Sequence, residues 1–232
     1  MRSEPAVTRE VWFIRHGESL ANAGLRTKNT QRCPLTELGF LQAEQCAMAL
    51  AKLPAPECIV ASPYLRAWQT AEPTWRIFPE AIREEWPVQE VQYLDAAACV
   101  DTTQGQRQTL AEVYWEQCDP LYTAPGAESF VAFIGRAKAA IERLAARTEK
   151  RIYLFSHGHF MSALAWVFLT RPSTLDAVAM RRYYQFIHGY TVANCAVMPL
   201  YFHPDGTHSL GSLWVPDGVE SIRPTGDGLA GL

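Results

Sequence analysis

The chain has 232 residues, of which 48% are hydrophobic and 19% charged, and its formal net charge is −3. This length allows one large domain with a substantial core, and this composition excludes a chain that is disordered over most of its length. The near-neutral charge gives the surface no general attraction for nucleic acid or for an anionic membrane, so we predict neither as a partner.

Strand and helix patterns alternate along most of the chain. Residues 11–14 form a continuous apolar run, which is typical of a strand buried on both faces of a parallel sheet. The predicted elements, in chain order, are a strand over 11–14, a helix over 36–53, a strand over 58–61, a helix over 62–71, helices over 106–117 and 128–147, a strand over 152–155, helices over 160–169 and 173–184, and a hairpin of 195–202 with 209–214. Thr36 and Ser62 are expected as N-caps, and Ser173 begins a capping-box-like pattern.

This alternation predicts an α/β fold in three layers, α/β/α, around a mainly parallel sheet. We expect a single domain over residues 1–232. Residues 91–127 fit the alternation poorly and are assigned to a small inserted cap over the carboxyl ends of the strands. Residues 215–232 are rich in Gly, Pro and Asp and are predicted to form a mobile tail.

The N-terminus, the densest apolar stretch and the cysteines predict where the protein is located in the cell. The first ten residues contain no apolar core of a secretion signal, and the densest apolar stretch, residues 160–169, has about half the length of a membrane-spanning helix. We therefore expect a cytoplasmic protein. The six cysteines include no Cys-x-x-Cys pair and are predicted to be free thiols.

Cationic and imidazole side chains follow the predicted strands. Arg15 and His16 come directly after the first strand, and His157 follows the third. Arg66 lies in the helical turn after the second strand. Because ligands of open α/β sheets bind beyond the carboxyl ends of the strands, these four side chains should converge. Two guanidinium groups and two imidazoles beside a helix N-terminus suit a dianion such as phosphate.

Several motifs in fixed order accompany these four residues. They are Arg15-His16-Gly17-Glu18-Ser19, Asn22, Pro34-Leu35-Thr36 with Gly39, Ser62-Pro63 with Arg66, Gly126 to Ser129, and Ser156-His157-Gly158. Together they resemble the histidine phosphatase superfamily, the phosphoglycerate mutase-like proteins, over roughly residues 11–169. An Arg-His-Gly-Glu string arises by chance in about one in a thousand chains of this length, so the resemblance is specific.

The resemblance implies a histidine acid-type phosphatase that hydrolyses a small phosphorylated substrate without a metal or another cofactor. His16 would be the nucleophile and would carry a phosphohistidine intermediate. Arg15, Arg66 and His157 would bind the equatorial oxygens of the phosphoryl group and stabilise its charge during transfer. Asn22 would donate one further hydrogen bond to the phosphate.

The reaction also needs a proton donor. A leaving alkoxide has to gain a proton and the attacking water has to lose one, so a carboxyl group is expected opposite His16. The candidates are Glu84, Glu85, Glu90 and Asp95. Glu90 is predicted as the general acid/base because Pro87-Val88-Gln89-Glu90 resembles the stretch that carries the family's acid.

The sequence departs from the family's pattern on the side that would face the substrate. Many relatives have Trp where this chain has Ala21, and many have a Gly-x-Trp-Glu-Gly-like stretch after the acid, where residues 91–95 read Val-Gln-Tyr-Leu-Asp. The long basic insertion of the phosphoglycerate mutases is not recognisable. We therefore favour a phosphatase, with mutase-type phosphoryl transfer as the alternative. The sequence leaves the substrate and the oligomeric state open.

Three other functions compete with this hypothesis. Gly17 to Ala21 forms a degenerate nucleophile elbow of the α/β-hydrolases, with Ser19 as nucleophile and His157 as base. A non-catalytic module would keep the same pocket only to recognise phosphate. A metal site on His157 and His159 would need a third ligand, and His159 is more simply interpreted as a structural residue.

Two neighbouring groups are also open to more than one interpretation. Glu18 is expected to support the first turn after the strand rather than to take part in catalysis. Arg26, Lys28 and Arg32 form a basic loop, which we interpret as solvated. The alternative is that this loop binds a second acidic group on the substrate.

Overall fold

The computed structural model describes residues 7–220. Its sheet has six strands in the order β3-β2-β4-β1-β5-β6. The strands are β1 (Arg9–Arg15), β2 (Cys58–Ala61), β3 (Ile82–Glu85), β4 (Arg151–Ser156), β5 (Val197–Phe202) and β6 (His208–Leu210). Strands β1 to β4 pair in parallel, and β5 and β6 are antiparallel to their neighbours. The predicted α/β fold with a mainly parallel sheet is confirmed.

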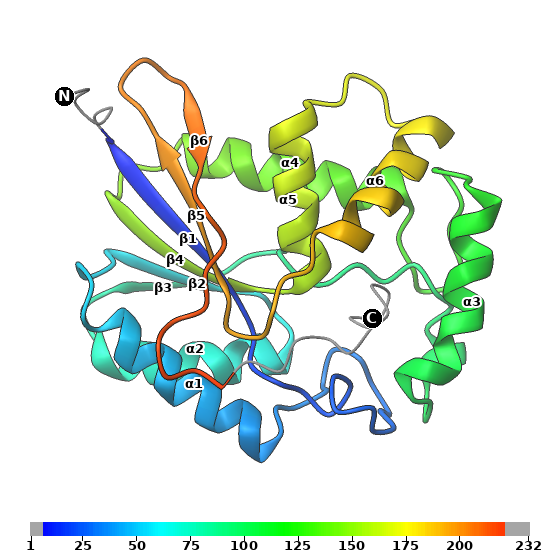
Figure 1. Cartoon of the computed structure of the whole chain (residues 1–232), viewed down its shortest axis with the longest axis horizontal. Helices are drawn as coiled ribbons and strands as arrows, with labels where there is room; N and C mark the ends of the chain where they lie inside the picture. Colours follow the sequence, from blue (N-terminus) through cyan, green and yellow to red (C-terminus); the bar gives the residue numbers. More distant parts are fainter. Residues whose placement is uncertain (1–6, 221–232) are drawn as a thin grey trace.

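Helices cover both faces of this sheet, with α1 and α2 on one side and α4 and α5 on the other (Figure 1). The helices are α1 (Glu37–Leu50), α2 (Leu65–Ile77), α3 (Gln104–Gln117), α4 (Phe130–Ala145), α5 (Gly158–Thr170) and α6 (Ala177–Gly189), with a single 3₁₀ turn, η1 (Ala97–Cys99). The apolar side chains of β1 pack on both faces of the sheet. Val11 and Phe13 pack in the cluster below α4 and α5, whereas Trp12 and Ile14 pack in the cluster with α1 and α2.

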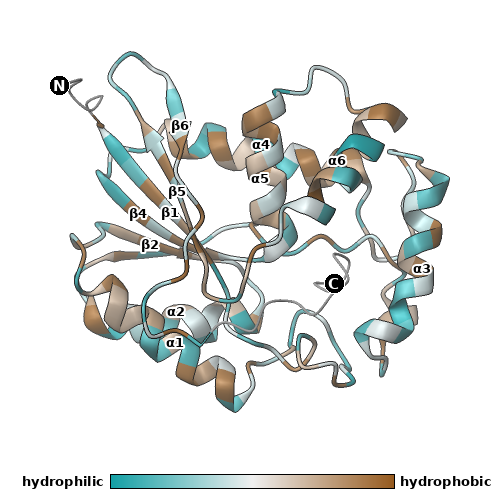
Figure 2. Cartoon of the chain, viewed as in Figure 1, coloured by the Kyte–Doolittle hydropathy of each residue, from teal (hydrophilic) through white to brown (hydrophobic). Residues whose placement is uncertain are grey.

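Figure 2 shows the same arrangement by hydropathy, with apolar residues on α5 and along the central strands. Nine of the thirteen residues of α5 are buried, because this helix lies between the sheet and α4 and α6. Within residues 7–220, no helix combines the length and the apolar character that crossing a membrane requires. All six cysteines are buried and free.

Two helices begin later than their sequence patterns predict. The N-cap of α2 is Tyr64 and not Ser62, and the helix continues through Pro73 to Ile77. Ser62 lies before the helix, and its hydroxyl contacts the ring of His157 in the site described below. For α6 the N-cap is Asp176, whose carboxylate accepts from the N–H of Ala179 at 2.9 Å. The cap of α2 was predicted wrongly because Tyr64 takes this position without a side-chain hydrogen bond, and the cap of α6 was predicted wrongly because Asp176 competes with Ser173 for the position.

Strand β3 has no counterpart among the predicted elements. It is an edge strand of four residues, Ile-Arg-Glu-Glu, which are exposed or half-buried. An edge strand with this exposure carries neither the apolar run of a central strand nor a clear alternation. Its first residue pairs with Cys58 and its last with Ala61.

The segment 91–127 contains η1 and α3 and lies beyond the carboxyl ends of the parallel strands (Figure 1). The predicted helix over 106–117 is present, and a capping box formed by Thr103 and Gln106 starts it slightly earlier. Tyr93, Tyr114 and Trp115 stack together inside this segment and join the core cluster of α4 and α5. An action of this segment as a cap over the substrate stays a prediction.

The end of the described chain returns to the sheet. The predicted hairpin forms, with Leu200 opposite Leu210, although β6 is shorter than expected. Val219 is 9% exposed and packs beside α1, and Gln42 donates to the carbonyl of Glu220 at 2.6 Å. The rest of the predicted tail, residues 221–232, lies outside the described residues, and its mobility stays a prediction.

Candidate active site

His16 is fixed at the carboxyl end of β1 by its own backbone. Its N–H donates to the carbonyl of Ser156 on β4 at 3.0 Å, and its carbonyl accepts from Asn194 Nδ2 at 2.9 Å. The side chain is 3% exposed. The imidazole therefore cannot move far from the edge of the sheet.

The partners of the His16 ring define its tautomer. Nδ1 lies 2.6 Å from the carbonyl oxygen of Gly17, which can only accept, so Nδ1 carries the hydrogen. Arg66 Nε donates to Nε2 at 3.0 Å, so Nε2 carries the lone pair. The structure thus presents a neutral imidazole whose lone pair faces a guanidinium group.

Burial keeps this imidazole and its neighbour neutral. The pKa of His16 lies well below its usual value because desolvation penalises the charged ring, and Arg66 and Arg15 add to the effect. Burial likewise lowers the pKa of His157 well below the usual value, followed by the charges of Arg66, His16 and Arg15. The two ring centroids are 5.1 Å apart.

Both arginines of the site are buried. Arg66, from the first turn of α2, also donates through Nη1 to the carbonyl of Thr30 at 2.7 Å. Arg15 donates through Nη1 to the carbonyl of Val192. Burial lowers the pKa of Arg15 to about 10, against the opposing charge of Glu90, so its guanidinium stays charged at neutral pH. Two cations therefore lie beside two neutral imidazoles.

His157 follows β4 and is the N-cap residue of α5. Its Nε2 lies 2.8 Å from the hydroxyl of Ser62, and Tyr64 packs edge-on against its ring at 5.3 Å. Its Nδ1 is buried and has no hydrogen-bond partner within residues 7–220, and the same holds for Arg15 Nε. Buried polar atoms without a partner are rare in folded proteins, and these two are available to bind a ligand.

Two asparagines connect the loop after β1 to the loop before β5. Asn22 accepts from the hydroxyl of Ser19 at 3.0 Å and from Asn194 Nδ2 at 3.3 Å. With its oxygen so used, Asn22 has its amide N–H groups as the donors that the predicted phosphate contact requires. Asn194 is 4% exposed and was missed by the sequence analysis, because no motif around it indicates a partner at His16.

Glu18 supports the turn after β1, as expected. Its carboxylate accepts from the hydroxyl of Thr36, the N-cap of α1, at 2.7 Å, and its N–H donates to Gln42 Oε1 at 2.7 Å. Glycine is required where this turn meets α1. A Cβ on Gly39 would lie 2.0 Å from the carbonyl oxygen of Glu18, and one on Gly17 would lie 2.6 Å from the carbonyl oxygen of Gly39.

Glu90, the predicted general acid/base, is buried, with 4% of its surface exposed. Its carboxylate accepts from the backbone N–H groups of His159 and Phe160 in the first turn of α5, and from that of Val91, each at 3.2 Å. These hydrogen bonds fix the Glu90 carboxylate at the N-terminus of α5, next to the N-cap residue His157. The other candidate acids are engaged elsewhere. Glu84 accepts from Trp86 Nε1 at 2.7 Å at the sheet edge.

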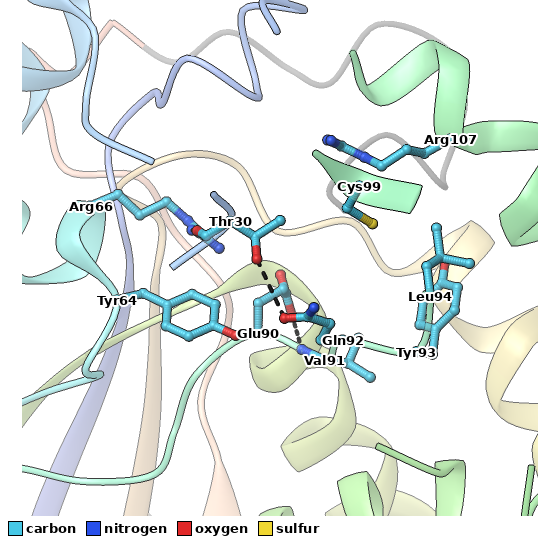
Figure 3. Close-up of a pocket in the computed structure, with 10 residues that line it drawn as sticks. All are labelled: Thr30, Tyr64, Arg66, Glu90, Val91, Gln92, Tyr93, Leu94, Cys99 and Arg107. Carbon is cyan, nitrogen blue, oxygen red and sulfur yellow. Dashed lines mark hydrogen bonds between the residues drawn. The ribbon is translucent and has the colours of Figure 1, made fainter. Parts of the chain in front are cut away.

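An open pocket adjoins Glu90 and Arg66. Its lining residues are Thr30, Tyr64, Arg66, Glu90, Val91, Gln92, Tyr93, Leu94, Cys99 and Arg107. In Figure 3, Arg66 and Tyr64 form one side of this pocket, and Arg107, Leu94 and Tyr93 form the opposite side, with Glu90 between them. The pocket therefore lies between Arg66 and Tyr64 on one side and residues of the segment 91–127 on the other.

The basic loop after Asn22 packs against the same segment. Arg26 donates to the carbonyl of Asp101 at 2.6 Å, and Thr27 pairs with Thr102 in an antiparallel bridge. Arg107 of α3 is 3% exposed and donates to the Thr27 hydroxyl at 3.3 Å. Arg26, Lys28 and Arg32 themselves are exposed, which agrees with a solvated loop.

The alternative sites find little support in these contacts. Ser19 donates its hydroxyl to Asn22, and the Nε2 of His157 is bound to Ser62 and not to Ser19. The N–H of His159 binds Glu90 and its carbonyl accepts from Tyr183 at 3.1 Å, as expected of a structural residue.

One group of potential metal ligands occurs in the described part of the chain, namely Cys58, Glu84 and Glu149 within 4.8 Å of one another. Arg147 pairs with both carboxylates, and burial raises the pKa of the Cys58 thiol to about 12. These residues form an ion-pair network at the amino ends of the strands and fit a metal poorly.

A comparison with known families identifies the family of this chain. The model of the histidine phosphatase superfamily, branch 1, matches residues 11–210. The chain belongs to the histidine phosphatase superfamily. The expected resemblance is thus confirmed, and it extends beyond residue 169 through α6 and the β5–β6 hairpin.

Solved structures of the histidine phosphatase fold are similar to this one. A mycobacterial glucosyl-3-phosphoglycerate phosphatase complexed with VO3 has a TM-score of 0.68 and 23% identity, covering 90% of this chain and all 100% of its own. The alpha-ribazole phosphatase from Shigella flexneri has a TM-score of 0.67 and 23% identity, covering 88% of this chain and 95% of its own. At this identity the likeness concerns the fold. No sequence among the curated proteins matches the chain.

Proposed function

We propose that this protein hydrolyses small phosphomonoesters through a phosphohistidine on His16. The observation that carries this proposal is the state of the His16 ring, which is neutral, has its lone pair on Nε2 and lies beside two buried arginines. Membership of the superfamily and the phosphatases among the similar folds support the same reaction class.

In the first step, the lone pair of His16 Nε2 forms a bond to phosphorus while the bond from phosphorus to the ester oxygen breaks. Arg66 now donates to that lone pair, so it has to exchange this bond for one to a phosphate oxygen. Arg15 Nε and His157 Nδ1, which are buried without partners in the described residues, supply two further contacts. Their charge and dipoles stabilise the transferring group without a metal ion.

In its protonated form Glu90 gives its proton to the leaving oxygen, so the first product departs as an alcohol and Glu90 is left as a carboxylate. In the second step, water attacks phosphorus, Glu90 takes the proton of that water, and the N–P electron pair returns to His16. Since the leaving group has to lie on the side of Glu90, we place the alcohol portion of the substrate in the adjoining pocket, which Glu90 and Arg66 both line.

The first prediction concerns the intermediate. Rapid quench of the wild type with a ³²P-labelled substrate should trap a phosphoenzyme that is labile in acid and stable in base, and His16→Ala should form none. Excess chelator should leave turnover unchanged. A His16→Ala variant with near-normal turnover would show that His16 is not the nucleophile.

The second prediction concerns the acid. Glu90→Gln should lower kcat about a hundredfold for an alkyl phosphate, whose alkoxide needs a proton as it leaves. For 4-nitrophenyl phosphate the loss should stay within about threefold, because nitrophenolate leaves without protonation. Both values come from steady-state kinetics with the two substrates. Equal slowing of both would assign the acid role to another group.

Two outcomes of these measurements favour the alternatives. Transfer of the label from the phosphoenzyme to an acceptor alcohol, in preference to water, would indicate a mutase. Binding of phosphate without any phosphoenzyme would indicate a recognition module.

A further inference from the structure

The backbone that carries Glu90 is held by an arginine from another element. Arg136, in the second turn of α4, donates through Nη1 to the carbonyl of Pro87 at 2.8 Å and to the carbonyl of Gln89 at 3.1 Å. One nitrogen thus fixes two carbonyls within the three residues before Glu90. The side chain of Arg136 is 18% exposed, and its bond to Gln89 is the more buried of the two.

Glu128 orients this arginine. Its carboxylate accepts from Arg136 Nε at 2.9 Å and from Nη2 at 2.6 Å, which is the two-pronged geometry of the strongest ion pairs. The backbone N–H of Glu128 also donates to the carbonyl of Gln92 at 2.7 Å. Arg136 and Glu128 therefore form hydrogen bonds to the backbone both before and after Glu90.

The same guanidinium also packs beside the helix end that holds the carboxylate. Its central carbon lies 5.2 Å from the ring centroid of Phe160, whose N–H donates to Glu90. Arg136 is consequently the side chain at which α4, the segment before Glu90 and the first turn of α5 meet.

We propose that Arg136, oriented by Glu128, is a positioning residue that fixes the Glu90 carboxyl group for proton transfer. This inference rests on the proposed function, in which Glu90 is the general acid/base. Arg136 acts through the backbone, and misplacement of a catalytic group by about 1 Å lowers the rate about a hundredfold. Lysine cannot substitute for it, because a single ammonium cannot serve Glu128 in two-pronged fashion while it binds both carbonyls.

The test compares leaving groups. Arg136→Gln should lower kcat for an alkyl phosphate about a hundredfold and for 4-nitrophenyl phosphate by less than about threefold, which repeats the pattern of Glu90→Gln. Arg136→Lys should resemble Arg136→Gln. Glu128→Gln should shift the ratio of the two rates in the same direction and by less, and it tests the proposal if Arg136→Gln does not fold.

Arg143 provides the matched control on the same helix, two turns later. Its guanidinium lies 3.8 Å from the ring centroid of Trp86 and 3.2 Å from Glu84, away from the carbonyls before Glu90. Arg143→Gln should leave the ratio of the two rates unchanged. Activity of every variant on 4-nitrophenyl phosphate reports that the phosphate-binding side is folded.

The outcomes separate this inference from the function on which it rests. If Arg136→Gln slows both substrates equally or neither, while Glu90→Gln remains selective, Arg136 does not position the acid. Full activity of Arg136→Lys on the alkyl phosphate would equally overturn the proposal. Equal slowing by Glu90→Gln would overturn the acid role together with the positioning role, whereas absence of a phosphoenzyme would overturn the proposed function itself.

Discussion

The two histidines of the site differ in what holds their rings. His16 is fixed by the carbonyl of Gly17, whereas the Nε2 of His157 depends on the hydroxyl of Ser62. A hydroxyl that donates to Nε2 leaves Nδ1 of His157 as an N–H group, which is the form that can donate to a phosphate oxygen. Ser62 accordingly sets the protonation pattern of the His157 ring.

The third prediction concerns the hydroxyl of Ser62. Ser62→Ala should lower kcat/KM for 4-nitrophenyl phosphate about tenfold, because the loss of one hydrogen bond to a buried ring costs about 1.4 kcal/mol. Ser162→Ala is the matched control, since Ser162 is 4% exposed and its hydroxyl donates to the carbonyl of Gly158 instead. Values within twofold of the wild type for both variants would assign the orientation of His157 to its packing against Tyr64.

Single residues could be predicted where a strand end placed them. Arg15 ends the buried strand β1, His16 follows it and His157 follows β4, and the parallel pairing of β1 with β4 brings those ends together. Asn194 and Arg136 could not be predicted, because their roles arise from contacts between distant segments. Asn194 contacts a carbonyl 178 positions earlier in the chain.

At the scale of elements, the turn after β1 depends on its close contact with α1. The backbone of Glu18 passes so near Gly39 that α1 can dock only with glycine at this position. The carbonyl of Glu18 also accepts from the N–H of Thr36 at 3.0 Å, which ties the turn to the N-cap of the helix. The position of His16 therefore depends on a residue of α1 that touches no substrate.

The fourth prediction tests this dependence. Gly39→Ala should lower the free energy of unfolding by about 1–3 kcal/mol through overpacking, and it should also lower kcat/KM. Gly135→Ala, in α4 where an added Cβ meets nothing within 4 Å, should raise stability by about 0.5–1 kcal/mol through its helix propensity. Urea unfolding and steady-state kinetics of the two variants measure both effects. Equal stability of the two variants would contradict the prediction.

Element prediction succeeded where burial is complete and failed where it is partial. The apolar run of β1 and the periodic stripe of α4 are direct consequences of packing on the sheet. Strand β3 is exposed or half-buried along its length, so hydrogen bonds to β2 define it while its side chains show no pattern. Tyr64 is the N-cap residue of α2 without a side-chain hydrogen bond, so no side-chain preference in the sequence predicts it.

Residues 7–220 include three buried histidines with a lowered pKa, namely His16, His157 and His159, and desolvation is the largest cause for each. In the unfolded chain these imidazoles bind protons near the usual pKa of 6.5. Below that pH the unfolded state therefore binds more protons than the folded state, so stability falls as the pH falls, until the pH reaches the folded-state pKa values.

The fifth prediction is that the urea midpoint decreases between pH 7.5 and pH 5.5. Each histidine that stays neutral contributes up to about 1.4 kcal/mol per pH unit below its unfolded pKa. His159→Gln should reduce this dependence, with exposed His188→Gln as the control. A midpoint that is constant over this range would show that the folded protein accommodates the protonated imidazoles.

The contacts that complete the site span nearly the whole chain. Arg15 binds the carbonyl of Val192, 177 positions later, and the strand order places β1 between β4 and β5. During synthesis, Arg15, His16, Arg66 and His157 leave the ribosome before the loop that contacts Arg15 and His16. A nascent chain therefore lacks the contacts of Arg15 with Val192 and of His16 with Asn194 until the segment before β5 has been made.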